Sequence, residues 1–332
     1  MKSRSATDLQ DPNFFGAPGD GGYPNYWLSS GEDGGNLVAD AHIGVMANVS
    51  SPVTPSPASA STLVVVNSGG ITFDLLFDAA APAGFKAGIV QAASMLSAAI
   101  FDKITVNLNI HYSGTGGGAF AGPDGGLFES YSTVTSDLIS HATSGDTIFN
   151  ALPGGTSIQG QSNVAVWNAE LKLWGFVGAN DTTTDDGSAT FATDINPNLL
   201  VGVALHELTH ALGRVPFGAA PDIFDLFRFT SAGVRLFQGG STAPAAYFSV
   251  DGGVTKLADF GQNSDPSDFL NSGVQGSTDP FDEFYSGGTS QNLSTVDKEL
   301  MDALGFQCDD QVFEDATAAI IFELGAQVDG FA

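Results

Sequence analysis

The segment from Val201 to Gly213 constrains this chain more than any other, because it contains the pattern HExxH. The two histidines, His206 and His210, stand four residues apart, so on an α-helix both can reach one cation from the same side. Neutral imidazole nitrogens bind Zn²⁺ at about 2.0–2.1 Å, and a catalytic zinc commonly takes three protein ligands. Glu207 lies beside the pair and is the expected general base for water activated by the metal. The segment therefore predicts a zinc site on a helix.

The residues around the motif favour a helix with defined ends. Asn196 or Asn198 can cap its N-terminus, and Pro197 suits its first turn. Gly213 stands where a C-terminal residue with a positive φ is expected. An apolar stripe away from the histidines predicts that one face of the helix is buried, and it consists of Leu205, Leu208 and Leu212.

The charge balance of the 332-residue chain is strongly acidic. Ten Lys and Arg residues oppose 37 Asp and Glu residues, which gives a formal net charge of −27. This balance argues against nucleic acid and against an anionic membrane as partners, because both are bound through basic patches. The single cysteine, Cys308, excludes an intrachain disulfide. The N-terminus has no apolar segment of the signal-peptide type, and no run is long enough to predict a membrane anchor.

Composition divides the chain into three parts. Residues 1–62 are rich in Gly, Pro, Ser and Asp, and predict a low-complexity tail, a pro-segment or a strap with little regular structure. Residues 63–307 predict one domain that contains the zinc motif. Residues 308–332 predict a terminal helix over Val312–Leu324, which either packs on the domain or serves as an export signal.

Hydrophobic periodicity predicts the framework of the domain. Apolar residues alternate with polar or smaller ones at 71–77 and at 104–111, which is typical of strands, and recur at helical spacing from Phe85 to Ile100. A strand, a helix and a strand in this order are most simply a right-handed βαβ unit. The expected fold class is α/β (α+β), with a twisted mixed sheet, a backing helix and the HExxH helix.

Other segments are predicted from shorter patterns. Tyr131–Ala142 and Asn163–Trp174 are expected to be helices, and Gly114–Gly126 a glycine-rich loop without a phosphate-binding pattern. Gly187–Thr193 predicts a strand that leads to the zinc helix and is a candidate edge strand for holding an extended peptide. Ser294 begins a capping-box pattern for a helix that reaches Leu304.

The third zinc ligand has two candidates in the residues that follow the motif. No histidine follows His210, so a carboxylate is the common ligand type left downstream, apart from Cys308. The nearest carboxylates are Asp222 and Asp225, and one could bind the metal while the other orients a histidine. Further acids are candidate Ca²⁺ ligands, although the lack of an EF-hand or GGxGxD repeat favours a solvated loop: Asp259, Asp265, Asp268, Asp279 and Asp282.

The motif resembles that of a known family of zinc peptidases. The sequence HELTHALG from His206 resembles the opening of the metzincin motif HExxHxxGxxH/D, although the position of the third ligand is Pro216, which cannot bind metal. The chain also resembles a group of bacterial metzincin-like metalloproteases over roughly residues 70–306. The matching segments are Gly213–Arg214, Asp225–Phe229, Phe248–Gly253, Leu293–Asp297 and Leu304–Gly305.

This resemblance implies a metzincin-like zinc endopeptidase that acts on protein or peptide substrates, with Asp225 as the third ligand and Asp222 as the alternative. The acidic and then apolar C-terminal segment also resembles substrates of type I secretion, which implies a secreted, extracellular protein. A second interpretation is an extracellular binding or surface-assembly protein on a peptidase fold, with a structural zinc. Glu207 favours the enzyme, because a structural site needs no base.

Overall fold

The computed structural model describes residues 14–16, 60–218, 220–237, 243–262 and 265–308. Most of the predicted tail, and the helix predicted at Val312–Leu324, lie outside these residues. Within the tail, β1 (Phe14–Gly16) pairs with the antiparallel strand β6 (Gly125–Ser130). No helix in the described part of the chain has the length and apolar character needed to cross a membrane.

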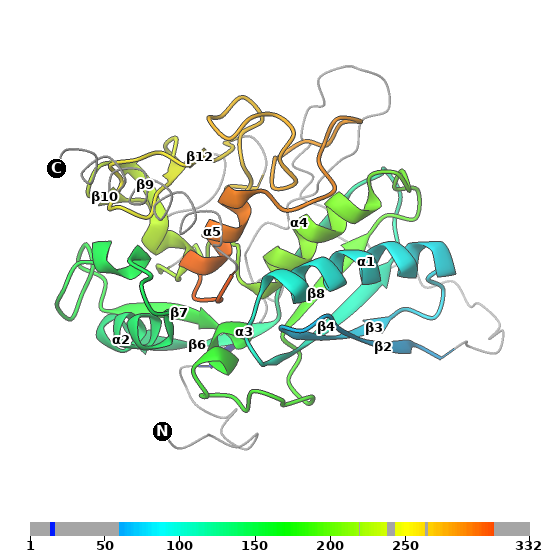
Figure 1. Cartoon of the computed structure of the whole chain (residues 1–332), viewed down its shortest axis with the longest axis horizontal. Coiled ribbons are helices and arrows are strands. Elements are labelled where there is room, and N and C mark those ends of the chain that lie inside the picture. The colour runs from blue at the N-terminus through cyan, green and yellow to red at the C-terminus, as the bar shows by residue number, and fades with distance from the viewer. Residues whose placement is uncertain (1–13, 17–59, 219, 238–242, 263–264, 309–332) are drawn as a thin grey trace, which may run out of the picture.

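A five-stranded mixed sheet forms the framework of the domain (Figure 1). Its order is β2 (Thr62–Asn67), β3 (Thr72–Phe77), β4 (Thr105–Tyr112), β8 (Gly187–Phe191) and β5 (Ala119–Pro123). The three central strands are parallel, and both edge strands are antiparallel to their neighbours. Helix α1 (Ala83–Ala99) connects β3 to its parallel neighbour β4. The predicted strand–helix–strand unit and mixed sheet are thereby confirmed.

Alternating burial explains why these strands form. In β4, the side chains of Val106, Leu108 and Ile110 are at most 1% exposed, whereas the residues between them are partly exposed. Helix α1 contributes its own apolar residues to the same core: Phe85, Ile89, Ala92 and Leu96. Each large aliphatic side chain that is fully buried contributes about 1.5–3 kcal/mol, so the pattern stabilises the sheet and the helix together.

Helix α4 (Leu200–Leu212) carries HExxH and packs close to α1 and to the sheet (Figure 1). Two glycines permit this approach. A Cβ atom on Gly88 of α1 would lie 2.5 Å from Leu200 Cδ2, and a Cβ on Gly187 of β8 would lie 2.8 Å from the carbonyl oxygen of Ala211. Any larger residue at either position would push α4 away, so the two glycines fix the depth at which the motif is buried.

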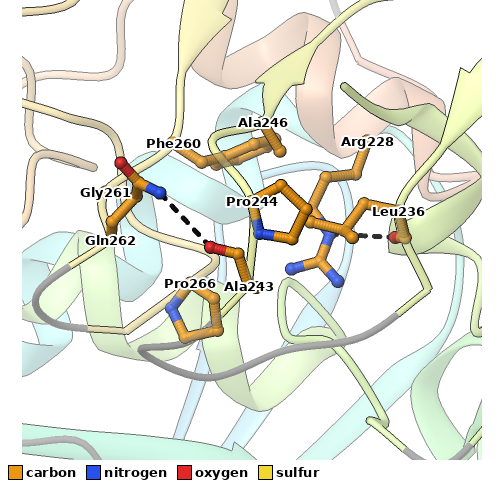
Figure 2. A pocket seen from close by; sticks show the side chains of 9 residues that line it. All are labelled: Arg228, Leu236, Ala243, Pro244, Ala246, Phe260, Gly261, Gln262 and Pro266. Carbon is orange, nitrogen blue, oxygen red and sulfur yellow. Dashed lines mark hydrogen bonds between the residues drawn. The ribbon is translucent and has the colours of Figure 1, made fainter. Parts of the chain in front are cut away.

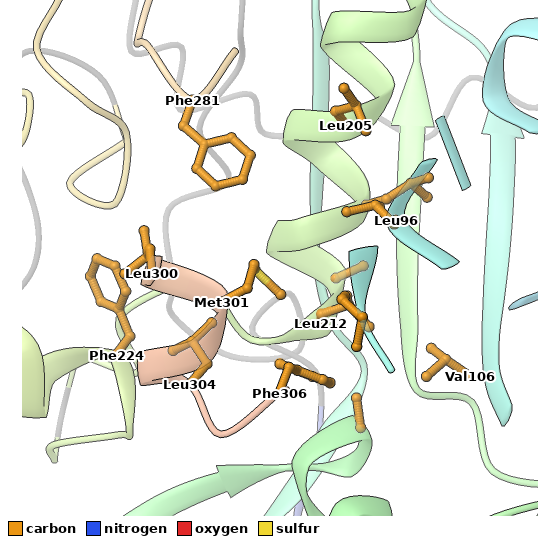
Figure 3. Close-up of a cluster of buried hydrophobic side chains, with 14 of the residues drawn as sticks. Leu96, Val106, Leu205, Leu212, Phe224, Phe281, Leu300, Met301, Leu304 and Phe306 are labelled. Carbon is orange, nitrogen blue, oxygen red and sulfur yellow. The ribbon is translucent and has the colours of Figure 1, made fainter. Parts of the chain in front are cut away.

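The surroundings of α4 differ from the prediction of one buried face. Every residue of this helix except Val201 is buried. Figure 3 shows the reason: Leu96 of α1 lies on one side of α4, while Phe281 and Met301 lie on the other. The helix thus forms the centre of the core, and its polar motif residues are enclosed with it.

The predicted ends of α4 are correct at one end only. Leu199 is the N-cap and gives no side-chain hydrogen bond, so the predicted caps at Asn196 and Asn198 are wrong. Asn196 Oδ1 instead accepts from the backbone nitrogen of Asn198, 3.0 Å away, in a turn before the helix. Gly213 follows the helix with a φ of 125°, as its position predicted.

A second, three-stranded sheet corrects one prediction, and the edge strand of the main sheet corrects another. The three-stranded sheet has the order β1, β6 and β7 (Asn163–Trp167). The segment 163–174, predicted as one helix, is strand β7 followed by the short helix α3 (Asn168–Leu173), because its first apolar residues pair with β6. The segment 114–126, predicted as a loop, contains β5, the edge of the main sheet. Helix α2 (Tyr131–His141) confirms the prediction there.

The C-terminal part adds short strands, turns and one helix. A four-stranded sheet has the order β10 (Val234–Arg235), β9 (Arg228–Ser231), β11 (Tyr247–Phe248) and β12 (Ala258–Asp259). Short 3-10 helices lie at η2 (Ile148–Ala151) and η3 (Phe224–Phe227). Helix α5 (Thr295–Ala303) begins with the predicted capping box, in which Ser294 and Asp297 bond to each other's backbone nitrogens.

Candidate metal centre

The two histidines of the motif lie on one face of α4, as their spacing predicts. Their ring centroids are 4.6 Å apart. The side chain of His206 is fully buried and that of His210 nearly so. The rings of Phe281 and Tyr285 lie beside His206, with centroids 6.1 and 5.8 Å from its own. The imidazoles are therefore held in a closed, partly aromatic environment.

Hydrogen bonds fix the tautomer of both histidines. His206 Nδ1 lies 2.8 Å from the carbonyl oxygen of Pro280, and His210 Nδ1 lies 2.7 Å from that of Arg214. A carbonyl oxygen only accepts, so each Nδ1 carries a hydrogen and donates it. Burial also lowers the pKa of each histidine, which favours the neutral ring. Each Nε2 then carries a lone pair that can bind a metal. Backbone carbonyls that accept the Nδ1 hydrogen typically orient metal-binding histidines in this way.

Asp268 completes the group, because its carboxylate meets both Nε2 atoms. Asp268 Oδ1 lies 2.9 Å from His206 Nε2 and 3.1 Å from His210 Nε2. In the described part of the chain, His206, His210 and Asp268 are the group of ligating side chains that could hold one metal ion. Tetrahedral zinc with bonds of about 2.0–2.1 Å places neighbouring ligand atoms roughly 3.3 Å apart. A small outward shift of the carboxylate would give that spacing.

A tight turn positions Asp268. Its backbone nitrogen donates to the carbonyl oxygen of Asp265 at 3.1 Å, and its carbonyl oxygen accepts from the nitrogen of Gly261 at 2.8 Å. The Asp265 carboxylate accepts from the backbone nitrogen of Ser267 at 2.8 Å. Burial acts to raise the pKa of Asp268, but the adjacent His206 and His210 outweigh it and hold that pKa below its usual value. This lowering requires a positive charge on the imidazole side, either a proton on Nε2 or a metal ion bound there, and the carboxylate is ionised when such a charge is present.

Glu207 is enclosed beside this group. Its side chain is 1% exposed, and neither Oε1 nor Oε2 has a hydrogen-bond partner among the residues described. Burial, followed by the negative charge of Asp268, raises the pKa of Glu207 well above its ordinary value. A buried carboxyl group with both oxygens unsatisfied is costly, so it indicates a site that a water molecule or ligand would complete.

Arg214 joins the end of α4 to the turn that carries Asp268. Its Nε donates to Thr209 Oγ1 at 3.0 Å, and its Nη1 donates to the carbonyl oxygen of Ser267 at 2.9 Å. Nη2 lies 3.0 Å from His210 Nε2, and Nη1 lies 3.6 Å from Asp268 Oδ1. The guanidinium carbon also lies 4.1 Å from the centroid of the Phe281 ring. Arg214 is thus both a clamp for the site and a cation at its edge.

Asp225 and Asp222, predicted as third ligands, have other partners. Asp225 Oδ1 lies 2.8 Å from Arg228 Nη2. The Asp222 carboxylate accepts from the backbone nitrogens of Phe217 and Asp225, at 2.6 and 2.9 Å. Neither belongs to the His206–His210 group. The structure therefore brings the two histidines to Asp268 and gives Asp225 and Asp222 roles in the turn after α4.

The acids considered for Ca²⁺ include the residue that the third-ligand prediction missed. Asp268, Asp279 and Asp282 are at most 6% exposed, so the predicted solvated loop is wrong for them. Asp268 lies far beyond His210 in sequence, and the nearest downstream acids were preferred for that reason. The high density of acidic residues after Asp259 was the feature of the sequence that could have indicated a ligand in this segment.

Gly261 and Pro266, from the segment that leads to Asp268, line a pocket of about 10 Å³ together with Arg228 and Leu236 (Figure 2). One water needs about that volume, so this pocket does not admit a peptide. His206, Glu207, His210 and Asp268 are not among the residues that line it. The predicted peptide-holding edge strand is also corrected, because β8 is paired on both sides and β5 forms the edge.

Comparison of the chain with protein-family models, with curated proteins and with solved structures gave no match. The resemblance to metzincin-like proteases therefore depends on the sequence motifs. The chemical argument for function depends on the histidines, Asp268 and Glu207.

Proposed function

We propose that the chain is a zinc-dependent endopeptidase in which His206, His210 and Asp268 hold the metal. The observation that carries this proposal is the convergence of two imidazole nitrogens on one carboxylate oxygen. Asp268 Oδ1 lies 2.9 Å from His206 Nε2 and 3.1 Å from His210 Nε2. Three acceptor atoms directed at one point repel each other unless a cation lies between them.

The donor set favours zinc over calcium. Zinc accepts imidazole nitrogen and carboxylate oxygen in a four-coordinate site, and three protein ligands leave one position for water or substrate. Calcium takes six to eight oxygen ligands, which this group does not provide. When bound, zinc would supply Lewis-acid polarisation of a scissile carbonyl and would lower the pKa of water.

Glu207 is the proposed general base of the reaction. It follows His206 directly on α4, and its two carboxyl oxygens have no partner among the described residues, so either can accept a proton from water and return it to the leaving amine. Burial and the negative charge of Asp268 raise the pKa of Glu207 above that of an exposed carboxyl group, which makes its carboxylate a stronger proton acceptor. Burial lowers the pKa of His206 and His210 and so favours the neutral rings, while their carbonyl partners hold the ring hydrogen on Nδ1.

A second candidate function is a binding or surface-assembly protein with a structural zinc. The burial of the site favours it, because the side chains of His206 and Asp268 are fully buried. A structural site has no use for a buried carboxyl group beside the metal, and the unsatisfied oxygens of Glu207 therefore favour the enzyme.

Hydrolysis of an unstructured protein such as casein by the zinc-loaded chain tests the proposal. Glu207→Gln is expected to keep one zinc per molecule while the rate falls about 10²–10⁴-fold, which is the usual contribution of general acid–base catalysis. His206→Ala is the matched variant that loses both the zinc and the activity. A zinc-loaded wild type without hydrolysis would favour the structural metal, and an active Glu207→Gln would remove Glu207 from the mechanism.

A further inference from the structure

Arg235, at the end of β10, is a buried cation that the metal site does not use. Its side chain is 6% exposed, and no carboxylate of the described residues lies within ion-pair distance of it. The other two buried arginines, Arg214 and Arg228, each lie beside an aspartate. The chain contains 37 acidic residues, yet none of those described forms an ion pair with Arg235, so the burial of this charge needs another explanation.

The guanidinium of Arg235 is rigidly held along one edge. Nε donates to the carbonyl oxygen of Leu226 at 2.6 Å, and Nη2 donates to that of Ala151 at 3.3 Å. The guanidinium carbon lies 4.6 Å from the centroid of the Phe229 ring. Among the described residues, Nη1 has no acceptor. One edge of the group is therefore fixed, and the other keeps its donors.

The backbone of Arg235 is clamped as well. Its nitrogen donates to Gln159 Oε1 at 2.6 Å, and its carbonyl oxygen accepts from Gln159 Nε2 at 2.9 Å. Gln159 has a φ of 45°, an unusual value for a residue other than glycine. This two-point contact holds the strand end against the loop that precedes β7. A binding group fixed in this way loses little entropy when a ligand arrives.

Arg235 lines a cavity of about 310 Å³. Its walls include Pro221, Leu236 and Phe237, and Gln161 contributes an exposed amide for which no side-chain hydrogen bond exists among the described residues. Arg235 is the only charged side chain among the described residues that line the space. The cavity thus combines one cation, an amide donor and apolar surface, in a volume typical of small-ligand sites.

We propose that this cavity binds the carboxylate of a small organic acid or of a peptide, with Arg235 Nη1 and the Gln161 amide as donors. One planar guanidinium with a free edge matches a singly charged, planar carboxylate. A phosphate, with about two charges, normally meets more than one cation, and only one lines this cavity. The apolar walls suit the carbon skeleton of the ligand. This inference is independent of zinc and of peptide hydrolysis.

Titration calorimetry on the full chain tests the site. The probes are succinate, an acetylated tripeptide with a free C-terminal carboxylate, the same tripeptide as its C-terminal amide, and inorganic phosphate. Binding of succinate assigns the free acid as a source, and binding of the tripeptide acid but not of its amide assigns the peptide carboxylate. Arg235→Gln is expected to weaken the bound carboxylate about 10–100-fold, because it removes a charge-assisted hydrogen bond.

Two further variants keep the test decisive. Lys103→Gln removes one positive charge from an exposed residue outside the cavity and is expected to bind like the wild type. Gln161→Ala changes an exposed side chain and is expected to weaken binding about 2–10-fold even if Arg235→Gln fails to fold. The proposal is overturned if no carboxylate binds, if phosphate binds more tightly than every carboxylate, or if Arg235→Gln and Gln161→Ala both bind like the wild type.

Discussion

Replacing Asp268 by Asn is the sharpest test of the proposed metal centre. The amide keeps the shape of the side chain but removes the charge that lies 2.9 and 3.1 Å from the Nε2 atoms of His206 and His210. Loss of a residue that only orients a ligand costs about 10–100-fold in metal affinity. Loss of the ligand itself is therefore expected to cost more than ~100-fold, which corresponds to more than about 2.7 kcal/mol.

Asp225→Asn is the matched variant, and its expected effects are the reverse. It removes the carboxylate that lies 2.8 Å from Arg228 Nη2, where both side chains are at most 1% exposed. Breaking a buried ion pair by removing one partner costs about 3–5 kcal/mol, so the free energy of unfolding should fall by that amount. Zinc affinity should stay unchanged, because Asp225 lies outside the His206–His210 group.

The assay measures zinc affinity by competition with a chromophoric chelator, in one buffer for the wild type and both variants. Urea denaturation of the zinc-free proteins gives the change in stability separately. Greater loss of zinc affinity in Asp225→Asn than in Asp268→Asn would make Asp225 the ligand and refute the reasoning. Equal affinities in all three proteins would exclude both carboxylates as ligands.

Two further predictions concern buried charges outside the metal centre. Lys172→Met should lower the free energy of unfolding by about 3–5 kcal/mol, because Lys172 and Asp186 form a fully buried ion pair at 2.5 Å. Lys256→Met, which breaks an exposed ion pair, should lower it by at most ~1 kcal/mol. Urea denaturation measures both changes, and equal changes would contradict the argument. Burial, then Asp279, raises the pKa of Asp282 to about 8, so the folded state keeps a proton that the unfolded state releases near pH 4. The free energy of unfolding of the wild type, relative to that of Asp282→Asn, should therefore fall between about pH 4 and 8 by at most about 1.4 kcal/mol per pH unit, and should be constant above about pH 8. Parallel pH profiles of the unfolding free energy for the two proteins would refute this prediction.

The parts of the fold that could be predicted have local patterns. The alternation at β3 and β4 and the helical spacing of α1 depend on neighbouring residues, and all three elements were predicted. Strand β7 was missed because its run of apolar residues is buried on both sides and has no alternation. Strand β5 was missed because glycines around it are typical of loops, and only its pairing with β8 makes it a strand.

The candidate site likewise has residues that a local pattern predicts and one residue that no local pattern predicts. His206, Glu207 and His210 lie within one helical turn, so spacing alone places them together. Asp268 reaches them through the packing of α4 against a later turn, and no local pattern records that contact. Asp225 was preferred because it begins the Asp225–Phe229 segment of the family resemblance, yet Arg228, three residues later, is its ion-pair partner. A nearby basic residue was the signal that Asp225 was already paired.

The position of Arg214 decides whether this group can accept a metal ion. Its Nη2 lies 3.0 Å from His210 Nε2, the same lone pair that a metal would use, so guanidinium and metal compete for it. Arg214 has other acceptors, however: Nη2 also donates to the carbonyl oxygen of His206 at 3.2 Å, while Nε and Nη1 are bonded to Thr209 and Ser267. Giving up His210 would leave every nitrogen of the guanidinium with a partner. Admitting a metal therefore costs one shared hydrogen bond and the repulsion between the metal ion and the guanidinium, which the Asp268 carboxylate between them reduces, while Arg214 continues to hold the Asp268 turn against α4.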